Sequence, residues 1–298
     1  MTTHGFWRQN QLENRRAVLN DYGQINKVWY LFPQGGGPRG SFTTFAEISA
    51  SLKSRDLIYL SGVLREHAVA PLGVFDVTIM GAANRTRQAT NAGVPTGGGA
   101  TWLAPTSPTA ATPLLELREQ GWTLENIFMN GPTDDACVKL HCEETTTYPD
   151  ASHFTARACR FGGGFIGIED FGGHSNCLVE DCSFEDMAGA GGGAIVCTNQ
   201  SIRIPQRWMV RNNRILPCVN GILSAHVDSS FLYNVIAKAT TTTINLAFGN
   251  TGLRNFVYMN IFNIATADFD PAGGVTGNAT DTWVNYVNDQ IEFGVPTN

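Results

Sequence analysis

The sequence predicts an all-β fold, a right-handed parallel β-helix in which the chain winds through stacked coils of short strands. A six-residue pattern that recurs between residues 123 and 262 is the first observation behind this prediction. The second is another apolar pattern, which follows each of the first five copies. The third is the composition, because 32 glycines and only 15% charged residues suit stacked strands and tight turns better than helical bundles.

The first pattern reads apolar-x-x-Asn/Cys-x-Phe/Ile, and its copies end 21 to 33 residues apart, a spacing typical of solenoids. The odd step to the Asn or Cys breaks the two-residue period of a strand, so we predict a bend there. Asparagine tolerates the left-handed conformation of such bends, which accounts for Asn126, Asn213, Asn234 and Asn260. Close copies are 179–184, 210–215, 231–236 and 257–262, and looser ones are 123–128 and 156–161.

The second pattern alternates apolar residues at 138–140, 166–168, 195–197, 222–224 and 244–246. Parallel strands stacked ~4.8 Å apart place equivalent side chains in columns and fill a core that no single coil could bury. Parallel crossovers in one sheet are right-handed in nearly all cases, which sets the predicted hand. The predicted column of this ladder contains Ile166, Ile195, Ile222 and Ile244.

The remaining elements divide the chain into an N-terminal arm at 1–40, a β-helix at 41–265 and a C-terminal cap or tail at 266–298. The β-helix begins with a capping box at 44–47 that opens a short helix, which we expect to cover the open end of the solenoid. Strands are predicted at 57–60 and 75–80. Residues 85–113 are rich in Pro, Gly, Thr and Ser, and predict a long excursion from the solenoid.

Charge and cysteine usage exclude several classes of protein. No apolar run approaches the ~18 residues of a membrane span, and a net charge of −6 argues against nucleic acid as the main partner. Residues 1–16 lack the apolar core of a signal peptide, so we expect synthesis in the cytoplasm without one. The 7 cysteines contain no C-x-x-C pair, which disfavours zinc and favours buried reduced thiols; a Cys159–Cys182 disulfide is the alternative.

The outward positions of the second ladder predict self-association. Three of four coils carry no charge at these positions, and a sheet face so poor in charge usually packs against something. We expect a homotrimer packed along the solenoid axis, with cover by a loop of the same chain as the alternative. The positions are Gly167, Glu169, Val196, Thr198, Leu223, Ala225, Asn245 and Ala247.

The candidate chemistry lies just beyond the second ladder, where Asp170, Asn199 and His226 are predicted to occupy neighbouring coils. A carboxylate pair and an imidazole there could act as acid and base on a glycosidic bond. Alternatively, these residue types cap turns at strand ends. The candidate catalytic residues are Asp170, His226, Glu169 and Asp181, and the candidate ligand-binding residues are Asn199, His174, Asp228 and Trp102.

Acidic pairs recur at Glu169-Asp170, Glu180-Asp181 and Glu185-Asp186. Two carboxylates roughly 5 to 9 Å apart would suit glycoside hydrolysis, and a cluster of three or more could hold Ca²⁺. Solvated charges on turns are the third interpretation. Apart from this calcium alternative, the sequence predicts no cofactor and no metal site.

The lead-in helix, the segments DLIYLSG and VTIMG and the later N-x-I/F words resemble the pectin- and pectate-lyase-like β-helix superfamily over roughly residues 40–265. That superfamily contains lyases, hydrolases, epimerases and phage tailspikes, so the resemblance implies the fold and leaves the activity open. The polygalacturonase motifs N-x-D, D-D, G-H-G and R-x-K are not reproduced, and Gly173-His174-Ser175 matches the third only in part.

The chain is most similar in style to tailspike-like virion proteins, since it has a short N-terminal segment, no signal peptide and a Gly- and Thr-rich solenoid. This resemblance implies a homotrimeric spike, fibre or surface protein of a phage particle. It would dock onto other virion proteins through residues 1–40 and contact host glycan. The alternative is an enzyme that cleaves acidic polysaccharide by hydrolysis or β-elimination.

Overall fold

The computed structural model describes most of the chain between residues 25 and 293. The ranges are 25–82, 100–106, 111–142, 150–187, 189, 191–198, 204–216, 218–223, 226–237, 242–245, 254–263, 275–276, 282–287 and 290–293. No helix within these ranges is long and apolar enough to cross a membrane.

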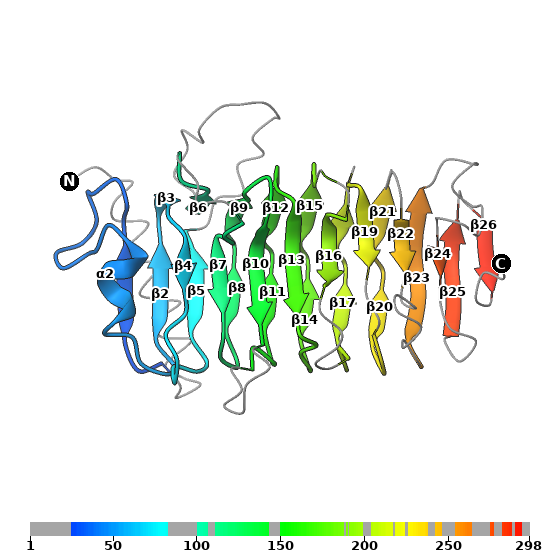
Figure 1. Ribbon diagram of the computed structural model, residues 1–298, viewed down its shortest axis with the longest axis horizontal. Helices are drawn as coiled ribbons and strands as arrows, with labels where there is room; N and C mark the ends of the chain where they lie inside the picture. Colours follow the sequence, from blue (N-terminus) through cyan, green and yellow to red (C-terminus); the bar gives the residue numbers. More distant parts are fainter. Residues whose placement is uncertain are drawn as a thin grey trace.

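The chain forms a right-handed parallel β-helix, as predicted, with one strand in each of three sheets per coil (Figure 1). We number the three sheets 1, 2 and 3. Sheets 1 and 2 are continuous through β23, and together with β26 they contain 18 strands in the described part of the chain, whereas sheet 3 contains 8. Sheet 1 contains β1 (Val28–Leu31), β2 (Leu57–Leu60), β5 (Thr78–Gly81), β8 (Thr123–Glu125), β11 (Thr155–Arg157), β14 (Leu178–Glu180), β17 (Met209–Arg211), β20 (Ser230–Leu232), β23 (Phe256–Asn263) and β25 (Thr282–Val287). Sheet 2 contains β3 (Gly62–Arg65), β6 (Ala100–Leu103), β9 (Phe128–Asn130), β12 (Arg160–Gly162), β15 (Ser183–Glu185), β18 (Arg214–Ile215) and β21 (Val235–Ala237). Sheet 3 contains β4 (Ala68–Val69), β7 (Leu115–Leu117), β10 (Ala136–His141), β13 (Ile166–Phe171), β16 (Gly193–Cys197), β19 (Asn220–Leu223), β22 (Thr242–Asn245) and β24 (Val275–Thr276).

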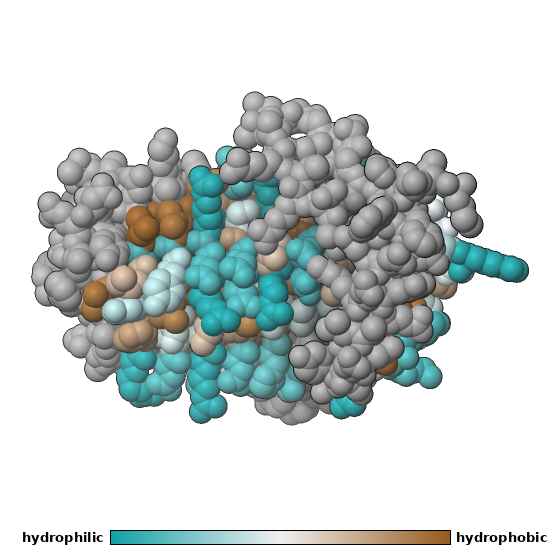
Figure 2. All heavy atoms as spheres, turned by 180° about the vertical axis from the view of Figure 1, so that it is seen from behind, coloured by the Kyte–Doolittle hydropathy of each residue, from teal (hydrophilic) through white to brown (hydrophobic). Residues whose placement is uncertain are grey.

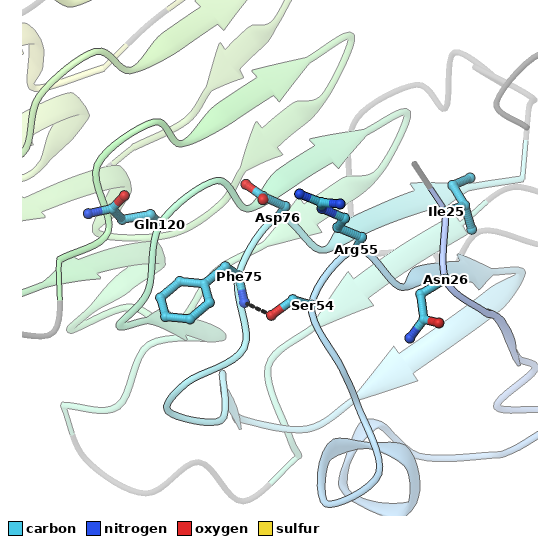
Figure 3. Close-up of a pocket in the computed structure, with 7 residues that line it drawn as sticks. All are labelled: Ile25, Asn26, Ser54, Arg55, Phe75, Asp76 and Gln120. Carbon is cyan, nitrogen blue, oxygen red and sulfur yellow. Dashed lines mark hydrogen bonds between the residues drawn. The ribbon is translucent and has the colours of Figure 1, made fainter. Parts of the chain in front are cut away.

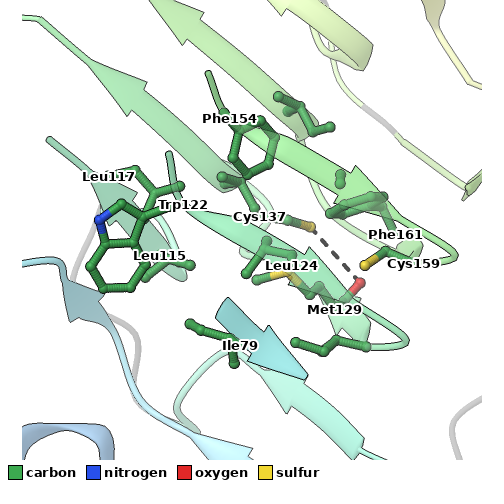
Figure 4. Packing of buried hydrophobic residues seen from close by; sticks show 14 of the residues in the cluster. Ile79, Leu115, Leu117, Trp122, Leu124, Met129, Cys137, Phe154, Cys159 and Phe161 are labelled. Atoms are coloured by element: carbon green, nitrogen blue, oxygen red, sulfur yellow. Dashed lines mark hydrogen bonds between the residues drawn. The ribbon is translucent and has the colours of Figure 1, made fainter. Parts of the chain in front are cut away.

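The first repeated pattern supplies the core columns of sheets 1 and 2. Val179 pairs with Val210, and Phe161 with Phe184, whose rings stack with centroids 4.9 Å apart. Equivalent apolar side chains of neighbouring coils pack together in the interior (Figure 4). The copy predicted at 123–128 lies one residue too early, because Leu124, and not Thr123, pairs with Ala156.

The second pattern supplies the core column of sheet 3, with one copy displaced. Ile195 pairs with Ile222, and Ile222 with Ile244, as predicted. Ile168 pairs with Ile195, whereas Ile166 pairs with Gly193. The prediction that placed Ile166 in this column is therefore wrong by two residues. Ile-Gly-Ile offers two frames with the same period, so the spacing alone could not choose between them.

The predicted bend is present. In the later copies of the six-residue pattern, however, the left-handed residue is the one before the repeated asparagine. Asn212, Tyr233 and Met259 have φ values of 55°, 56° and 55°. Asn213, Asn234 and Asn260 instead point inward and are 1% exposed. In the 123–128 copy the left-handed residue is Asn126, because that copy is shifted by one.

The inward asparagines form a ladder of hydrogen bonds between coils. Asn213 Nδ2 donates to Val179 O (2.9 Å) and Asn234 Oδ1 (3.0 Å), and Asn213 Oδ1 accepts from Cys182 N–H (2.9 Å). Asn234 Nδ2 donates to Asn260 Oδ1 at 2.9 Å. Each amide thus satisfies buried backbone groups that the bend removes from the sheet.

A second stack of left-handed residues lies in the turns that lead into sheet 1, and we call it the turn column. The backbone N–H groups of its first six members donate to the next coil, as in Arg55 N to Phe75 O (2.9 Å) and Asp76 N to Gln120 O (3.0 Å). The φ values lie between 52° and 77°. The members are Arg55, Asp76, Gly121, His153, Asn176, Arg207, Asp228 and Arg254.

The two ends of the solenoid are closed differently. Helix α2 (Phe45–Ser49) begins with the predicted capping box and lies at the N-terminal end (Figure 1). Its Phe45 packs on Trp102 with ring centroids 6.0 Å apart. At the other end β26 (Gln290–Phe293) pairs antiparallel with β25. β1 falls within the segment predicted as an arm, and β24 to β26 fall within the predicted tail.

The predicted excursion at 85–113 is interrupted. β6 lies within it and pairs with β3 and β9, so Ala100–Leu103 belongs to sheet 2. Its strand character was hidden because only four residues separate Gly- and Pro-rich stretches. On the face shown in Figure 2, hydrophilic side chains fill the middle of the described surface and hydrophobic ones lie beside them toward the C-terminal end.

Replacing Asn213 with Ala should lower the free energy of unfolding by about 2–4 kcal/mol, because the change leaves buried backbone groups without partners. Asn212→Gly, at the adjacent exposed left-handed position, should change it by less than about 0.5 kcal/mol. Urea denaturation of both variants measures the difference. Equal effects would contradict the inward asparagine ladder.

Candidate functional site

Asp170 and His174 form a buried pair at the end of β13. Asp170 is 2% exposed, and its Oδ1 lies 2.6 Å from His174 Nδ1 and accepts from Gly173 N–H at 3.0 Å. Asp170 is in register with Leu140 and Cys197, so the predicted column with Asn199 does not form. The cause is the two-residue displacement of Ile166. Asn199 itself lies outside the described residues.

His226 comes close to this pair from another coil. Ser175 and Val227 both bridge to Gln206, so His174 and His226 occupy equivalent places two coils apart. The His226 ring packs edge-on against Trp208 and Phe231, each with centroids 5.2 Å apart. Burial lowers the pKa of His226 to about 4, although the nearby Asp170 carboxylate raises it. The structure thus gathers Asp170, His174 and His226, but inside the solenoid.

This cluster does not present the acid and base that were expected at a solvent-exposed groove. His174 and His226 are each 1% exposed, so a polymer bound to the surface cannot reach their rings. Asp170 accepts three hydrogen bonds from the backbone of residues 173 and 174, which holds the turn after β13. The geometry is that of a buried polar support for a turn, and catalysis by these residues stays a prediction.

Glu169 lies on the outer side of sheet 3, in a row with Glu116 and Lys139. Lys139 Nζ is 3.3 Å from Glu169 Oε2, and Thr198 Oγ1 donates to Glu169 Oε1. Val196 and Leu223 follow Glu169 in register, and Val196 is 2% exposed although it was predicted to face outward. Gly167 was expected outward, but a Cβ there would meet the Phe184 ring at 2.7 Å.

Glu116 is the most strongly perturbed carboxylate on this outer row. His141 Nδ1 lies 2.8 Å from Glu116 Oε1, and Arg118 Nε lies 2.6 Å from the same oxygen. Burial raises the pKa of Glu116, but the contacts with His141 and Arg118 outweigh it and bring the pKa to about 2. Glu116 is therefore ionised at neutral pH and can accept a proton but not supply one.

Asp181 and Asp228 lie on exposed turns at different corners of the solenoid. Asp181 sits between sheets 1 and 2 with φ 55°, and Asp228 belongs to the turn column with φ 52°. Arg254 binds Asp228 through two bonds of 2.7 and 2.8 Å. The Arg254 hydrogen bonds lower the pKa of Asp228. The structure does not bring either residue to Asp170.

Two of the acidic pairs form ion pairs with arginine side chains through their glutamates. Arg157 and Arg211 both bind Glu180, and Arg160 Nη2 binds Glu185 at 2.6 Å. Burial raises the pKa of Glu180, but the bonds from the two arginines outweigh it and lower the value. Within the described ranges no group of three or more His, Cys, Asp or Glu side chains is placed to hold a metal ion.

Trp102 is part of the core and not of a surface site. It is fully buried on β6, and its Nε1 donates to Glu66 O at 2.8 Å. Stacking on a surface ligand, which the sequence suggested, is therefore contradicted. The sequence misled because Trp102 was assigned to a loop, whereas β6 carries it into the interior.

An open cavity of about 740 Å³ lies beside the turn column in the first coils (Figure 3). Arg55, Phe75, Asp76 and Gln120 line it, and all four are exposed. Phe75 N–H donates to Ser54 Oγ at 3.0 Å across its floor. None of the predicted site residues lines this cavity.

An apolar surface that sequence reasoning missed covers the later coils of sheets 1 and 2, and we call it the C-terminal apolar face. The outward column Glu125, Arg157, Glu180 and Arg211 continues as Leu232 and Tyr258. The column Arg160, Ser183 and Arg214 continues as Val235 and Ile261. Tyr233 is 54% exposed, and Met209, Phe256 and Ile261 are 38–44% exposed.

The aromatic side chains of this face contact one another. Phe256 and Tyr258 stack with centroids 5.3 Å apart, and Tyr233 meets Tyr258 edge-on at 6.4 Å. These positions lie between the core positions of the six-residue words. The signal was therefore present in the sequence, but only the correct register of the bend assigns it to the outside.

All seven cysteines are buried. Burial raises the pKa of Cys137 to about 12 and that of Cys182 well above its usual value. Such thiols are unreactive nucleophiles and act as core side chains. Cys159 and Cys182 stand opposite each other in neighbouring coils without forming the disulfide that was the alternative.

No protein-family model matches this chain, and no curated protein matches its sequence. Among solved structures it is similar to pectin methylesterase PemA from Erwinia chrysanthemi, with 10% identity, a TM-score of 0.38 and coverage of 86% of this chain and 69% of the other. It is also similar to a pectin methylesterase in complex with a hexasaccharide, with 10% identity, a TM-score of 0.38 and coverage of 82% and 68%.

Asp170→Asn should lower the free energy of unfolding by about 1–3 kcal/mol, because it turns an amide N–H₂ group toward the buried donors from which the carboxyl group accepts. Asp181→Asn removes the same charge from an exposed turn and should change it by less than about 0.5 kcal/mol. Thermal and urea denaturation at neutral pH measure both effects. A stable Asp170→Asn protein would contradict the supporting role of the pair.

Proposed function

We propose that this chain is a structural β-helix that associates side by side with further copies of itself. The observation that carries the proposal is the C-terminal apolar face, where two outward columns change from alternating charges to Leu232, Tyr258, Val235 and Ile261. Contiguous exposed apolar surface with aromatic side chains is typical of protein interfaces. Burying a side chain such as Ile261 or Phe256 stabilises an interface by about 1.5–3 kcal/mol.

The ends of the solenoid favour lateral packing over end-to-end stacking. Phe45 and Ile48 of α2 cover the N-terminal end of the core, and the antiparallel β25–β26 pair ends the parallel pairing of sheet 1. Flat faces with the same ~4.8 Å spacing of strands can match rung to rung along their length. A homotrimer along the solenoid axis, the arrangement expected from the sequence, uses such lateral faces.

We also propose, from the predictions made from the sequence, where this assembly occurs and which other molecules it contacts. The chain would be made in a host cytoplasm and built into a phage particle as a spike, fibre or surface protein. Its other partners would be virion proteins, bound through residues 1–40, and host glycan. Stacked Phe256 and Tyr258 rings on an exposed strand also suit contact with a sugar ring.

The wild-type protein should therefore have a mass about three times the 32.3 kDa of one chain in light scattering after size exclusion. Ile261→Lys should weaken the assembly at least about tenfold, since a charge replaces a buried apolar side chain. Ser183→Lys introduces the same charge in the same outward column, at the charged end, and should leave the mass unchanged. A wild-type mass of one chain would overturn the proposal.

A polysaccharide-cleaving enzyme is the second candidate, and the outer row of sheet 3 is the observation that favours it. Glu116 and Glu169 stand two coils apart, roughly 9–10 Å between their Cα atoms, with Lys139 between them. Inverting glycosidases separate their carboxyl groups by about 6.5–9.5 Å. Both carboxylates contact cations, so the row offers a base but no evident acid.

Purified protein incubated with a panel of bacterial capsular and plant polysaccharides tests this second candidate. If the row is catalytic, Glu169→Gln should lower the rate of reducing-end release at least about 100-fold, the usual contribution of a general acid or base. Glu125→Gln removes a carboxylate from the outer side of sheet 1, away from the row, and should keep the wild-type rate. No release from any polymer, or equal rates in the two variants, would exclude the row.

A further inference from the structure

We propose that the buried cluster of Asp170, His174 and His226 makes the middle coils of the β-helix acid-sensitive, so that they open before the rest of the solenoid as the pH falls. The observation behind it is that the Asp170–His174 pair and a second imidazole two coils away are buried in the interior of the solenoid. This regulation goes beyond the structural role proposed above and does not depend on it.

The geometry ties the cluster to the packing of three coils. His226 lies between the rings of Trp208 and Phe231, and its Nδ1 is 3.4 Å from Ser229 Oγ. Trp208 Nε1 donates to His174 O at 2.8 Å, so the same indole joins the two histidines. Nε2 of His174 and Nε2 of His226 are buried without a hydrogen-bond partner among the described atoms.

A protonated His226 would be a buried cation without water around it, and the neighbouring charged groups do not compensate for this loss. Asp170 is the charged group that acts on it, but its carboxylate already accepts from His174 and the backbone of the turn. The Cys177 thiol near Asp170 stays neutral, because burial and then Asp170 raise its pKa. Asp228, two residues along the chain, is exposed and bound to Arg254.

The sign of the pH effect follows from the folded and unfolded proton affinities. An unfolded His226 binds its proton near pH 6.5, whereas burial lowers its folded pKa to about 4. Below pH 6.5 the open state therefore takes up the proton and the closed state does not, so stability is lost as the pH falls toward 4. The opening equilibrium rises by up to about tenfold for each pH unit in this window.

Opening should begin where His226 packs. A protonated imidazole between Trp208 and Phe231 must reach water, and this requires the coils of β17 and β20 to separate. The first coils contain α2, β2 and β5, which do not contact the cluster. Acid should therefore expose the backbone of residues 204–232 while residues 57–81 remain protected.

Amide hydrogen exchange read by mass spectrometry tests this in the full chain. From pH 7.5 to 5.0, after correction for intrinsic exchange rates, opening in peptides covering 204–232 should rise about 25-fold. Peptides covering 57–81 in the same sample should change by less than about threefold. His226→Phe keeps a ring against Trp208 and Phe231 and should abolish the rise. His153→Asn removes an exposed histidine at a left-handed position that Asn tolerates, and should keep it.

A ring-resolved NMR titration of the wild-type protein gives an answer that does not depend on a variant folding. The His226 ring should stay neutral until about pH 4. A His226 ring that titrates near pH 6.5 would overturn the proposal. So would a His226→Phe protein with the wild-type acid response, or acid-induced exchange that begins in the first coils.

Discussion

The structure depends on one constraint, the in-register parallel pairing of each coil with the next. Each backbone N–H and C=O of a short strand finds its partner in a neighbouring coil, so no coil is satisfied by itself. The same register stacks like side chains, and Phe161 lies on Phe184 because their strands pair without slippage. A slip of one residue would turn every core side chain outward. This is why the bends that join the sheets must keep a fixed geometry.

The corners hold that register by two different means. On exposed turns, left-handed residues such as Asn212 and Arg207 let the chain change direction and donate a backbone hydrogen bond to the next coil. Inside the bend, Asn213 and Asn234 replace the strand hydrogen bonds that the turn removes. In earlier coils Cys159 and Cys182 take the inward position, where a small apolar side chain fills the space without continuing the amide ladder.

Some polar side chains lie inside the solenoid, and some apolar side chains lie on its surface. Asp170, His174 and His226 are polar residues in the interior, whereas Tyr233, Phe256 and Ile261 are apolar residues on the surface. In the first group, Asp170 accepts hydrogen bonds from the turn after β13, and His226 is the residue that we propose to be acid-sensitive. The side chains of the second group are 41–54% exposed. Polar groups that catalysis would need at the surface are largely paired, as Glu180 is with two arginines.

The sequence by itself determined the repeated words, the capping box at Thr44, the strand at 57–60 and hence the parallel β-helix. Local pattern is sufficient for these features because each coil repeats the same alternation and the same turn. It could not decide whether Ile166 or Ile168 joins the core column, and this displacement separated Asp170 from its predicted neighbours. It also could not place Trp102 in the core or Ile261 on the surface. Only the packing of one coil on another decides such positions, because a two-residue period is the same in either frame while the contacts across coils are not.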